Sequence, residues 1–143
     1  MALRKKTVKI RTALLSYYRA HRRDLPWRRT RDPYAIWVSE VMLQQTQVAT
    51  VVPRYAEFLR QFPSVRALAG ATQSRVCEAW AGLGYYHRAR HLHEASRVVQ
   101  DTLDGELPKT AAELQRLPGV GRYTAGAVRR LRSAKKRRWW TAM

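Results

Sequence analysis

The sequence predicts an all-α fold, and three observations support this prediction. Apolar residues recur at the three- and four-residue spacing of amphipathic helices over most of the chain. Residues that typically begin helices precede several of these runs. No stretch alternates apolar and polar residues for long enough to indicate a strand. With 45% hydrophobic residues, the 143-residue chain has enough apolar material for one packed domain.

The first predicted helix covers residues 8–21, in which apolar and basic side chains are interleaved. The sequence Leu25-Pro26-Trp27-Arg28 then breaks the helical pattern. Asp32 provides an N-cap and Pro33 a first helical position, which together predict a helix that runs to about Gln45.

The rest of the chain is predicted to form a series of shorter helices. Thr46 is expected to cap a helix that Pro53 bends or restarts before residues 55–62. Further helices are expected at about 64–81, 86–103, 110–117 and 124–131. Thr110 and Glu113 have the spacing of a capping box, which would supply acceptors for the free amides at a helix start.

Positive charge is concentrated at the two ends of the chain. The net charge is +18, from 28 basic and 10 acidic residues. Residues 1–31 carry eleven basic groups and one acid, residues 32–128 carry ten and nine, and residues 129–143 carry seven and none. A balanced middle with cationic ends predicts a polyanionic partner, with nucleic acid as the first candidate. Basic ends that only aid solubility are the alternative.

The composition also excludes several classes of protein. Cys77 is the single cysteine, so an internal disulfide and a multi-cysteine metal site are excluded. No apolar run has the length of a membrane span or of a signal peptide, so an intracellular protein with no membrane partner is expected. His87, His91 and His93 lie close together, but nothing completes a ligand set. They are expected to be surface histidines, and no metal site is predicted.

A glycine-containing turn joins two of the predicted helices. It consists of Leu117, Pro118, Gly119, Val120 and Gly121. Glycine permits a tight turn and a close backbone approach, and the amides at the start of the next helix are then free to face a phosphate oxygen. The turn therefore predicts a helix-hairpin-helix that grips a nucleic-acid backbone without reading its sequence. An ordinary turn between helices is the alternative.

Glu40 lies within an apolar helical run and is a candidate general acid. An apolar environment raises the pKa of a carboxyl group, which suits proton donation. A glutamate at the edge of a helix face is the alternative. Gln44 and Gln45 follow near the end of this helix, where they could hydrogen-bond base edges or could be solvated.

The segment from Trp80 to Arg90 combines two glycines with aromatic rings and arginines. Rings of this kind stack between bases, and guanidinium groups bind phosphates. The segment therefore predicts a wedge and clamp for nucleic acid. The alternative is a loop between helices with tyrosines in the core.

Four motifs together resemble the MutY-type adenine DNA glycosylases of the helix-hairpin-helix superfamily. They are Leu25–Arg28, Trp37–Thr50, Trp80–Tyr86 and Leu117–Gly126, in order within about residues 10–128. The resemblance implies a helix-hairpin-helix DNA glycosylase fold over residues 1–128, with the hairpin at about 110–128. It also implies a hydrolase of base excision repair that removes adenine mispaired with 8-oxoguanine or guanine in double-stranded DNA. Such a protein is expected to be a monomer, in the cytoplasm of a bacterium or in the nucleus or mitochondria of a eukaryote.

The resemblance also implies roles for individual residues. Glu40 matches the acid that protonates adenine, and Tyr123 matches the residue beside the anomeric carbon. Trp27 and Arg28 match the adenine pocket. Gln45, Thr46, Leu83 and Tyr85 match residues that contact the lesion strand. Arg88, an arginine of the predicted wedge and clamp, is also expected to contact DNA.

Two alternatives to a base-removing glycosylase follow from the same motifs. A bifunctional glycosylase/lyase places a lysine nucleophile at position 123, and the tyrosine there argues against it. A noncatalytic helix-hairpin-helix DNA-binding fragment is the other alternative.

The sequence departs from the family's pattern after about residue 128. Family members continue to Val-Asp-Gly-Asn, whose aspartate stabilises the cationic sugar, whereas no acid follows Glu113 here. Trp139–Met143 is encoded by TGG TGG ACN GCN ATG, and reading one base earlier forces Val-Asp and allows Gly-Asn. We therefore interpret residues 129–143 as a basic, out-of-frame tail. The family's [4Fe-4S] cluster requires four cysteines that are absent, so no cofactor is expected and the incomplete domain is predicted to be inactive or nearly so.

Overall fold

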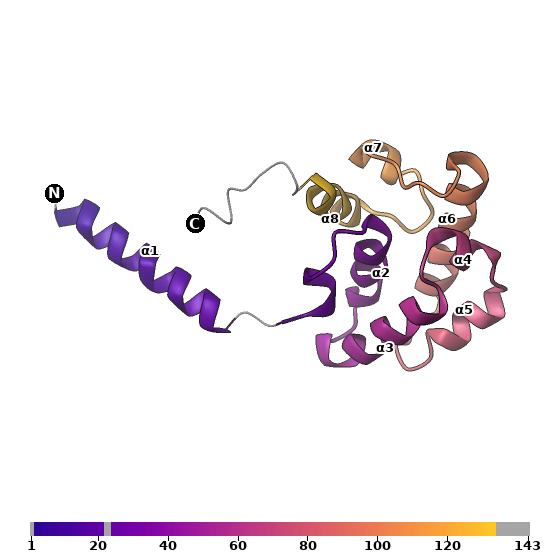
Figure 1. Cartoon of the computed structure of the whole chain (residues 1–143), viewed down its shortest axis with the longest axis horizontal. Coiled ribbons are helices and arrows are strands. Elements are labelled where there is room, and N and C mark those ends of the chain that lie inside the picture. Colours follow the sequence, from indigo (N-terminus) through magenta and orange to yellow (C-terminus); the bar gives the residue numbers. More distant parts are fainter. Residues whose placement is uncertain (1, 22–23, 134–143) are drawn as a thin grey trace.

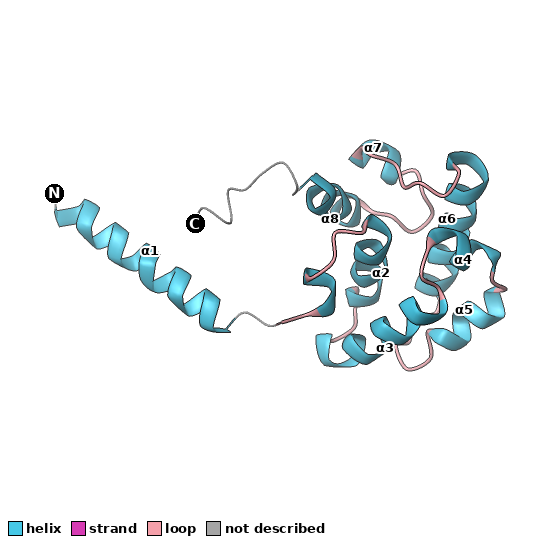
Figure 2. Cartoon of the chain, viewed as in Figure 1, coloured by secondary structure: helices cyan, strands magenta, loops and turns pink. Residues whose placement is uncertain are grey.

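The computed structural model describes residues 2–21 and 24–133. These residues form helices joined by turns and contain no strand, which confirms the predicted all-α class (Figure 2). Helices α2 to α8 form a bundle, and α1 (Ala2–His21) lies apart from it (Figure 1). Within the described part of the chain, no helix has the length and hydropathy needed to cross a membrane. Most of the predicted tail lies outside the described residues.

The break after the first helix and the start of the next one are both confirmed. The break contains η1 (Pro26–Arg28), a 3-10 turn with proline at its start. Helix α2 (Pro33–Leu43) begins where the carboxylate of Asp32 accepts a hydrogen bond from the amide two residues further on, at 3.1 Å. It ends at Leu43, two residues before the predicted end at Gln45, because Gln44 already has an extended backbone with ψ of 119°.

Two predicted boundaries in the next segment are wrong. Thr46 does not cap α3 (Val48–Gln61), because the residue at the N-cap is Gln47 and the Thr46 hydroxyl accepts a hydrogen bond from an arginine instead. Pro53 lies in the first half of α3 and the helix continues past it, so the predicted restart is wrong, whereas the predicted bend stays a prediction.

The single helix expected at 64–81 is two helices, α4 (Val65–Gly70) and α5 (Gln73–Ala79). Each has its own N-cap. The hydroxyls of Ser64 and Thr72 each accept a hydrogen bond from the amide three residues on, at 3.1 and 3.2 Å. The second cap begins a new helix in a run that sequence periodicity treats as continuous.

The last three helices lie close to their predicted positions. They are α6 (His87–Leu103), α7 (Ala111–Leu114) and α8 (Arg122–Ser133). The hydroxyl of Thr110 accepts a hydrogen bond from the amide of Glu113 at 3.3 Å, which confirms the N-cap of α7.

Helix α2 is the centre of the bundle and is apolar on all sides. It packs against η1, α3, α6 and α8. Eight of its eleven residues are buried: Tyr34, Ala35, Ile36, Trp37, Val38, Ser39, Val41 and Met42. A helix with apolar residues around its whole circumference is stable only inside a core, so this pattern fixes α2 as the element around which the others pack.

An aromatic cluster completes the core beside α2. The ring centroid of Phe58 lies 5.0 Å from that of Phe62 and 5.9 Å from that of Trp80. The hydroxyl of Tyr34 donates a buried hydrogen bond to the carbonyl of Phe62 at 2.7 Å, which ties α2 to the end of α3.

One of the three histidines of α6 was misplaced by the sequence prediction. His87 and His91 are exposed, but His93 is buried where α6 packs on α4. Its Nε2 lies 2.8 Å from the carbonyl oxygen of Ala71, and burial lowers the pKa of its imidazole. His93 is therefore a core residue with a satisfied ring nitrogen.

Candidate functional site

Glu40 lies in the last two turns of α2, where its side chain is half-buried. Burial raises the pKa of the Glu40 carboxyl from its ordinary value of 4.5, because desolvation penalises the charged form. The charge of Arg130 on α8 opposes this effect and lowers the pKa. Glu40 is therefore an acid that retains its proton to higher pH than an exposed glutamate does.

Replacing Glu40 with glutamine tests this environment through stability. The folded state binds the Glu40 proton more tightly than the unfolded state does, because the folded-state pKa is raised. The protonated carboxyl therefore favours folding below about pH 4.5. This contribution to stability is lost as the pH rises through the folded-state pKa. Glu40→Gln is therefore expected to be more stable than the wild-type chain at pH 7, with the difference shrinking as the pH falls toward 4.5. Urea unfolding at several pH values measures the difference. The matched control is Glu78→Gln at an exposed position on α5, and a Glu40→Gln difference independent of pH would contradict the interpretation.

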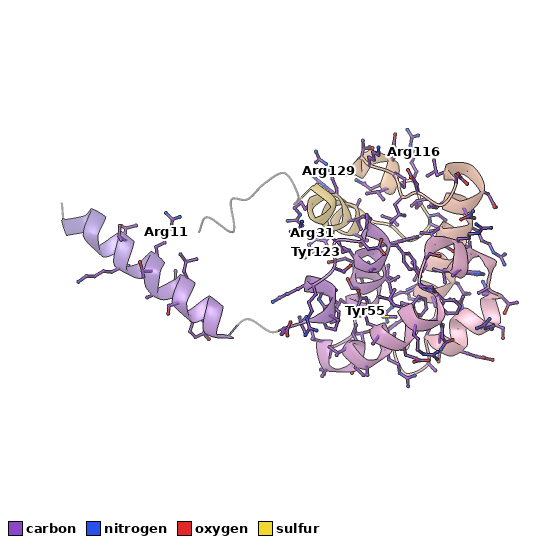
Figure 3. The ribbon with its side chains drawn as sticks, in the orientation of Figure 1. Arg11, Arg31, Tyr55, Arg116, Tyr123 and Arg129 are labelled. Carbon is purple, nitrogen blue, oxygen red and sulfur yellow. The ribbon has the colours of Figure 1, made fainter. Side chains whose placement is uncertain are left out.

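Tyr123 lies in the first turn of α8, the helix that packs against α2. Its side chain is 78% exposed, and Figure 3 shows it at the edge of the bundle. The two helices are tied together next to it, because the amide of Gln44 donates to the hydroxyl of Thr124 at 3.0 Å. Glu40 and Tyr123 therefore come from adjoining helices, and Gln44 is a structural link rather than a free group for base edges.

Trp27 and Arg28 lie in η1, which packs against α2. The Trp27 ring is half-buried and meets the ring of Tyr55 edge to face, with centroids 5.4 Å apart. Arg28 is exposed. The structure thus brings the predicted adenine-pocket residues to the helix that carries Glu40.

Two short loops carry the predicted lesion-contacting residues. The first, residues 44–47, joins α2 to α3, and the second, residues 80–86, joins α5 to α6. Gln45 and Tyr85 both adopt left-handed backbone conformations, with φ of 58° and 47°. Both side chains are exposed, whereas Leu83 is only 5% exposed. The second loop therefore exposes the tyrosines Tyr85 and Tyr86, whereas Leu83 is buried.

Arg88 requires a correction, because its guanidinium does not point to solvent. The side chain is 4% exposed, and it donates hydrogen bonds to backbone carbonyls and to the Thr46 hydroxyl. The predicted phosphate clamp would need a free guanidinium. Arg88 instead lies in the protein interior, where its guanidinium forms hydrogen bonds with both loops.

The hairpin between α7 and α8 has the turn that the sequence predicts. The amide of Val120 donates to the carbonyl of Leu117 at 3.2 Å, and both side chains are buried. Gly119 and Gly121 are exposed, and Gly119 has φ of 73°. The exposed residues Arg116 and Arg122 flank the hairpin, so positive charge lies on either side of its exposed glycines.

A cavity of about 180 Å³ lies between α2, α6 and the hairpin. Its walls are Trp37, Val41, Gln44, His87, Arg88, His91, Leu92, Pro118 and Gly119. Two buried nitrogen atoms of these residues, Trp37 Nε1 and Arg88 Nε, have no hydrogen-bond partner in the described part of the protein. Sequence reasoning missed this cavity because it depends on how three separate segments pack.

The described residues contain no group of three or more histidine, cysteine or acidic side chains that could hold a metal ion. The iron–sulfur cluster implied by the sequence resemblance needs four cysteine thiolates. The chain has only Cys77, so it cannot hold that cluster.

The described residues thus form an all-helical bundle with a half-buried acid on its central helix and a glycine-containing hairpin flanked by two arginines. The chain belongs to the HhH-GPD superfamily of base excision DNA repair proteins, whose sequence profile matches residues 38–139. This match extends beyond residue 128, where the sequence prediction placed the domain boundary.

Particular relatives narrow the comparison. The chain is 53% identical to human adenine DNA glycosylase in an alignment of 127 positions that covers 82% of this chain and 23% of the human protein. It is 41% identical to the adenine DNA glycosylase of Buchnera aphidicola (subspecies Baizongia pistaciae) over 82% of this chain and 33% of the relative. The chain thus spans about a quarter to a third of the length of these curated relatives.

Solved structures agree on the fold. A thermostable thymine-DNA glycosylase superposes with a TM-score of 0.79 at 33% identity, over 95% of this chain and 63% of that one. An endonuclease III trapped as a covalent intermediate with DNA superposes with a TM-score of 0.73 at 22% identity, over 88% of this chain and 60% of that one. At that identity the second match supports the fold alone.

Proposed function

We propose that this chain carries the acid-bearing part of an adenine DNA glycosylase, which acts on adenine mispaired with 8-oxoguanine or guanine in duplex DNA. The observation that carries the proposal is Glu40, whose carboxyl is half-buried on α2 beside the helix that carries Tyr123. Similarity to adenine DNA glycosylases over most of the chain supports the choice of base.

In this proposal Glu40 acts as a general acid. The glycosidic bond is unreachable within the base stack, so the adenine must first leave the duplex. A carboxyl group that keeps its proton can then protonate a ring nitrogen of adenine, which makes the base a better leaving group. The sugar left behind has oxocarbenium character, and electron-rich groups stabilise such a cation. Tyr123 is the residue assigned next to the sugar.

Tyr123 also separates this proposal from a bifunctional glycosylase/lyase. A phenol cannot form the Schiff base through which a lysine nucleophile cleaves the strand. Borohydride is therefore expected to trap no covalent complex between this chain and DNA that contains an abasic site. A trapped complex would favour the lyase.

The hairpin and the loops supply the DNA-binding surface in this proposal. The exposed glycines of the hairpin allow a phosphate to approach the backbone, and Arg116 and Arg122 add positive charge. Tyr85 is 56% exposed at the tip of the second loop, where its ring can stack on a base. Binding of this kind releases counterions, so the affinity should fall steeply as the salt concentration rises.

The proposal is tested by measuring the affinity of the chain for two duplexes that are identical except for the base opposite adenine. Fluorescence anisotropy is expected to give tighter binding to an adenine:8-oxoguanine duplex than to an adenine:thymine duplex. Tyr85→Ser is expected to reduce the affinity for the mispaired duplex about tenfold, because base–aromatic stacking contributes about 1–3 kcal/mol. Tyr86→Ser, at the adjacent exposed tyrosine, is the control and should have a smaller effect. Equal affinity for both duplexes would favour a noncatalytic DNA-binding fragment.

A further inference from the structure

We propose that Arg88 is a positioning residue that holds the first loop (residues 44–47) and the second loop (residues 80–86) together as one rigid DNA-contacting unit. In this arrangement Gln45 and Tyr85 meet the DNA together, and the unit discriminates mispaired from paired adenine. The recognition role rests on the proposed function, whereas the coupling between the loops depends only on the contacts described below.

The guanidinium of Arg88 first binds the carboxyl end of α2. Its Nη1 donates to the carbonyls of Val41 and Met42 at 2.9 and 3.0 Å, and also to the carbonyl of Gln44. The last carbonyls of a helix have free acceptor capacity, although that of Val41 also accepts from the backbone amide of Gln44 at 3.3 Å. A cation at this end of the helix is favoured by the helix dipole. Nη2 donates to the hydroxyl of Thr46 at 2.8 Å. Arg88 thus binds the first loop on both sides of Gln45.

The Nη2 atom of Arg88, which binds Thr46, also binds the second loop. Nη2 donates to the carbonyls of Leu83 and Gly84 at 3.2 and 3.3 Å. The guanidinium carbon also lies 5.4 Å from the ring centroid of Trp80 and 5.7 Å from that of Tyr85, within the range of cation–π contacts. One side chain therefore connects the two loops, which are about 40 residues apart in the sequence.

The two loops require the hydrogen bonds of Arg88 because each loop contains a residue with a strained backbone. Gln45 and Tyr85 both have a positive φ, which ordinary side chains adopt only when their surroundings hold them there. Arg88 binds the residues on either side of Gln45, and it binds the two residues immediately before Tyr85. The arginine thus stabilises the backbone conformation that directs both exposed side chains outward.

Arginine is specifically suited to this role. Its planar fork presents donors in several fixed directions, whereas a lysine ammonium is a single point that cannot reach both loops at once. Burial lowers the pKa of Arg88 from its ordinary value of 12.5, and at neutral pH the group remains charged. The charge is stabilised by carbonyl dipoles of both loops, so disturbance of one loop is expected to weaken the hold on the other.

Hydrogen exchange on the full chain tests the coupling. Arg88→Lys is expected to lower the protection of amides in both loops by about tenfold, because hydrogen bonds to a charged group are lost on both sides. Arg90→Lys, at an exposed position on the same helix, is the matched control and should change neither loop. Loss of protection confined to one loop in Arg88→Lys, or no loss in either loop, would overturn the proposal.

Duplex binding tests the recognition role. Arg88→Lys is expected to bring the ratio of affinities for adenine:8-oxoguanine and adenine:thymine duplexes close to one, whereas Arg90→Lys should retain the wild-type ratio. A ratio unchanged by Arg88→Lys would overturn the role in discrimination. If the wild-type chain itself shows no preference, the proposed function fails, and the hydrogen-exchange result still decides whether Arg88 couples the loops.

Discussion

Replacing Phe58 with alanine is expected to lower the free energy of unfolding by about 3–5 kcal/mol. The side chain is completely buried, and it joins α3 to Phe62 and Trp80 through ring contacts. Its removal loses the transfer free energy of the ring and leaves a cavity in an aromatic cluster that cannot readily collapse. Because small domains have only about 5–15 kcal/mol of stability, the variant should be close to unfolding at physiological temperature.

Denaturant titration followed by tryptophan fluorescence measures this change. Leu103→Ala is the control, because Leu103 is 41% exposed at the end of α6 and should cost much less. A loss below about 1 kcal/mol for Phe58→Ala would contradict the placement of this residue in the core.

Gly119→Ala is expected to destabilise the protein by about 2–4 kcal/mol, from backbone strain and overpacking together. A Cβ atom at position 119 would lie 2.6 Å from the Cβ of His91, so either the hairpin or α6 must move. The φ of 73° adds strain for any residue with a side chain. Because the hairpin is part of the proposed phosphate contact, the same variant should also bind duplex DNA more weakly.

Gly121→Ala is the matched control in the same hairpin. A Cβ atom there meets no other atom within 4 Å, so its stability should change by only about 0.5 kcal/mol. Thermal unfolding of the two variants measures the contrast. Equal midpoints for Gly119→Ala and Gly121→Ala would contradict the close packing of the hairpin on α6.

Helices with strong local signals could be predicted from the sequence. The caps at Asp32 and Thr110 are local chemistry, and both are present in the structure. The errors occurred where tertiary contacts decide the boundary. Thr46 is a good capping residue, but its hydroxyl accepts from Arg88 across the bundle. Thr72 divides the run at 64–81, because its cap competes with an apolar period that alone predicts one helix.

The candidate site was predictable in its residues but only partly in their roles. Glu40 is half-buried, as its apolar neighbours indicate. The charge of Arg88 predicts a surface position and a phosphate contact, but the structure shows that its side chain is buried. The spacing of Arg88, Leu92, Ala95 and Val99 along α6 is nevertheless that of a buried helix face, and all four are buried. His93 and Ser96 lie within the same buried stripe. Charge alone therefore cannot place a residue when helical periodicity disagrees with it.

We propose that the chain takes a mispaired adenine out of the duplex and presents it to Glu40. The most direct measurement uses a duplex with 2-aminopurine in place of the adenine opposite 8-oxoguanine, because 2-aminopurine fluoresces more strongly when it leaves the base stack. The proposed function predicts that fluorescence rises as the chain binds, and that it rises less when 2-aminopurine is opposite thymine. Saturating binding without a fluorescence change would contradict the claim and leave a protein that grips only the DNA backbone.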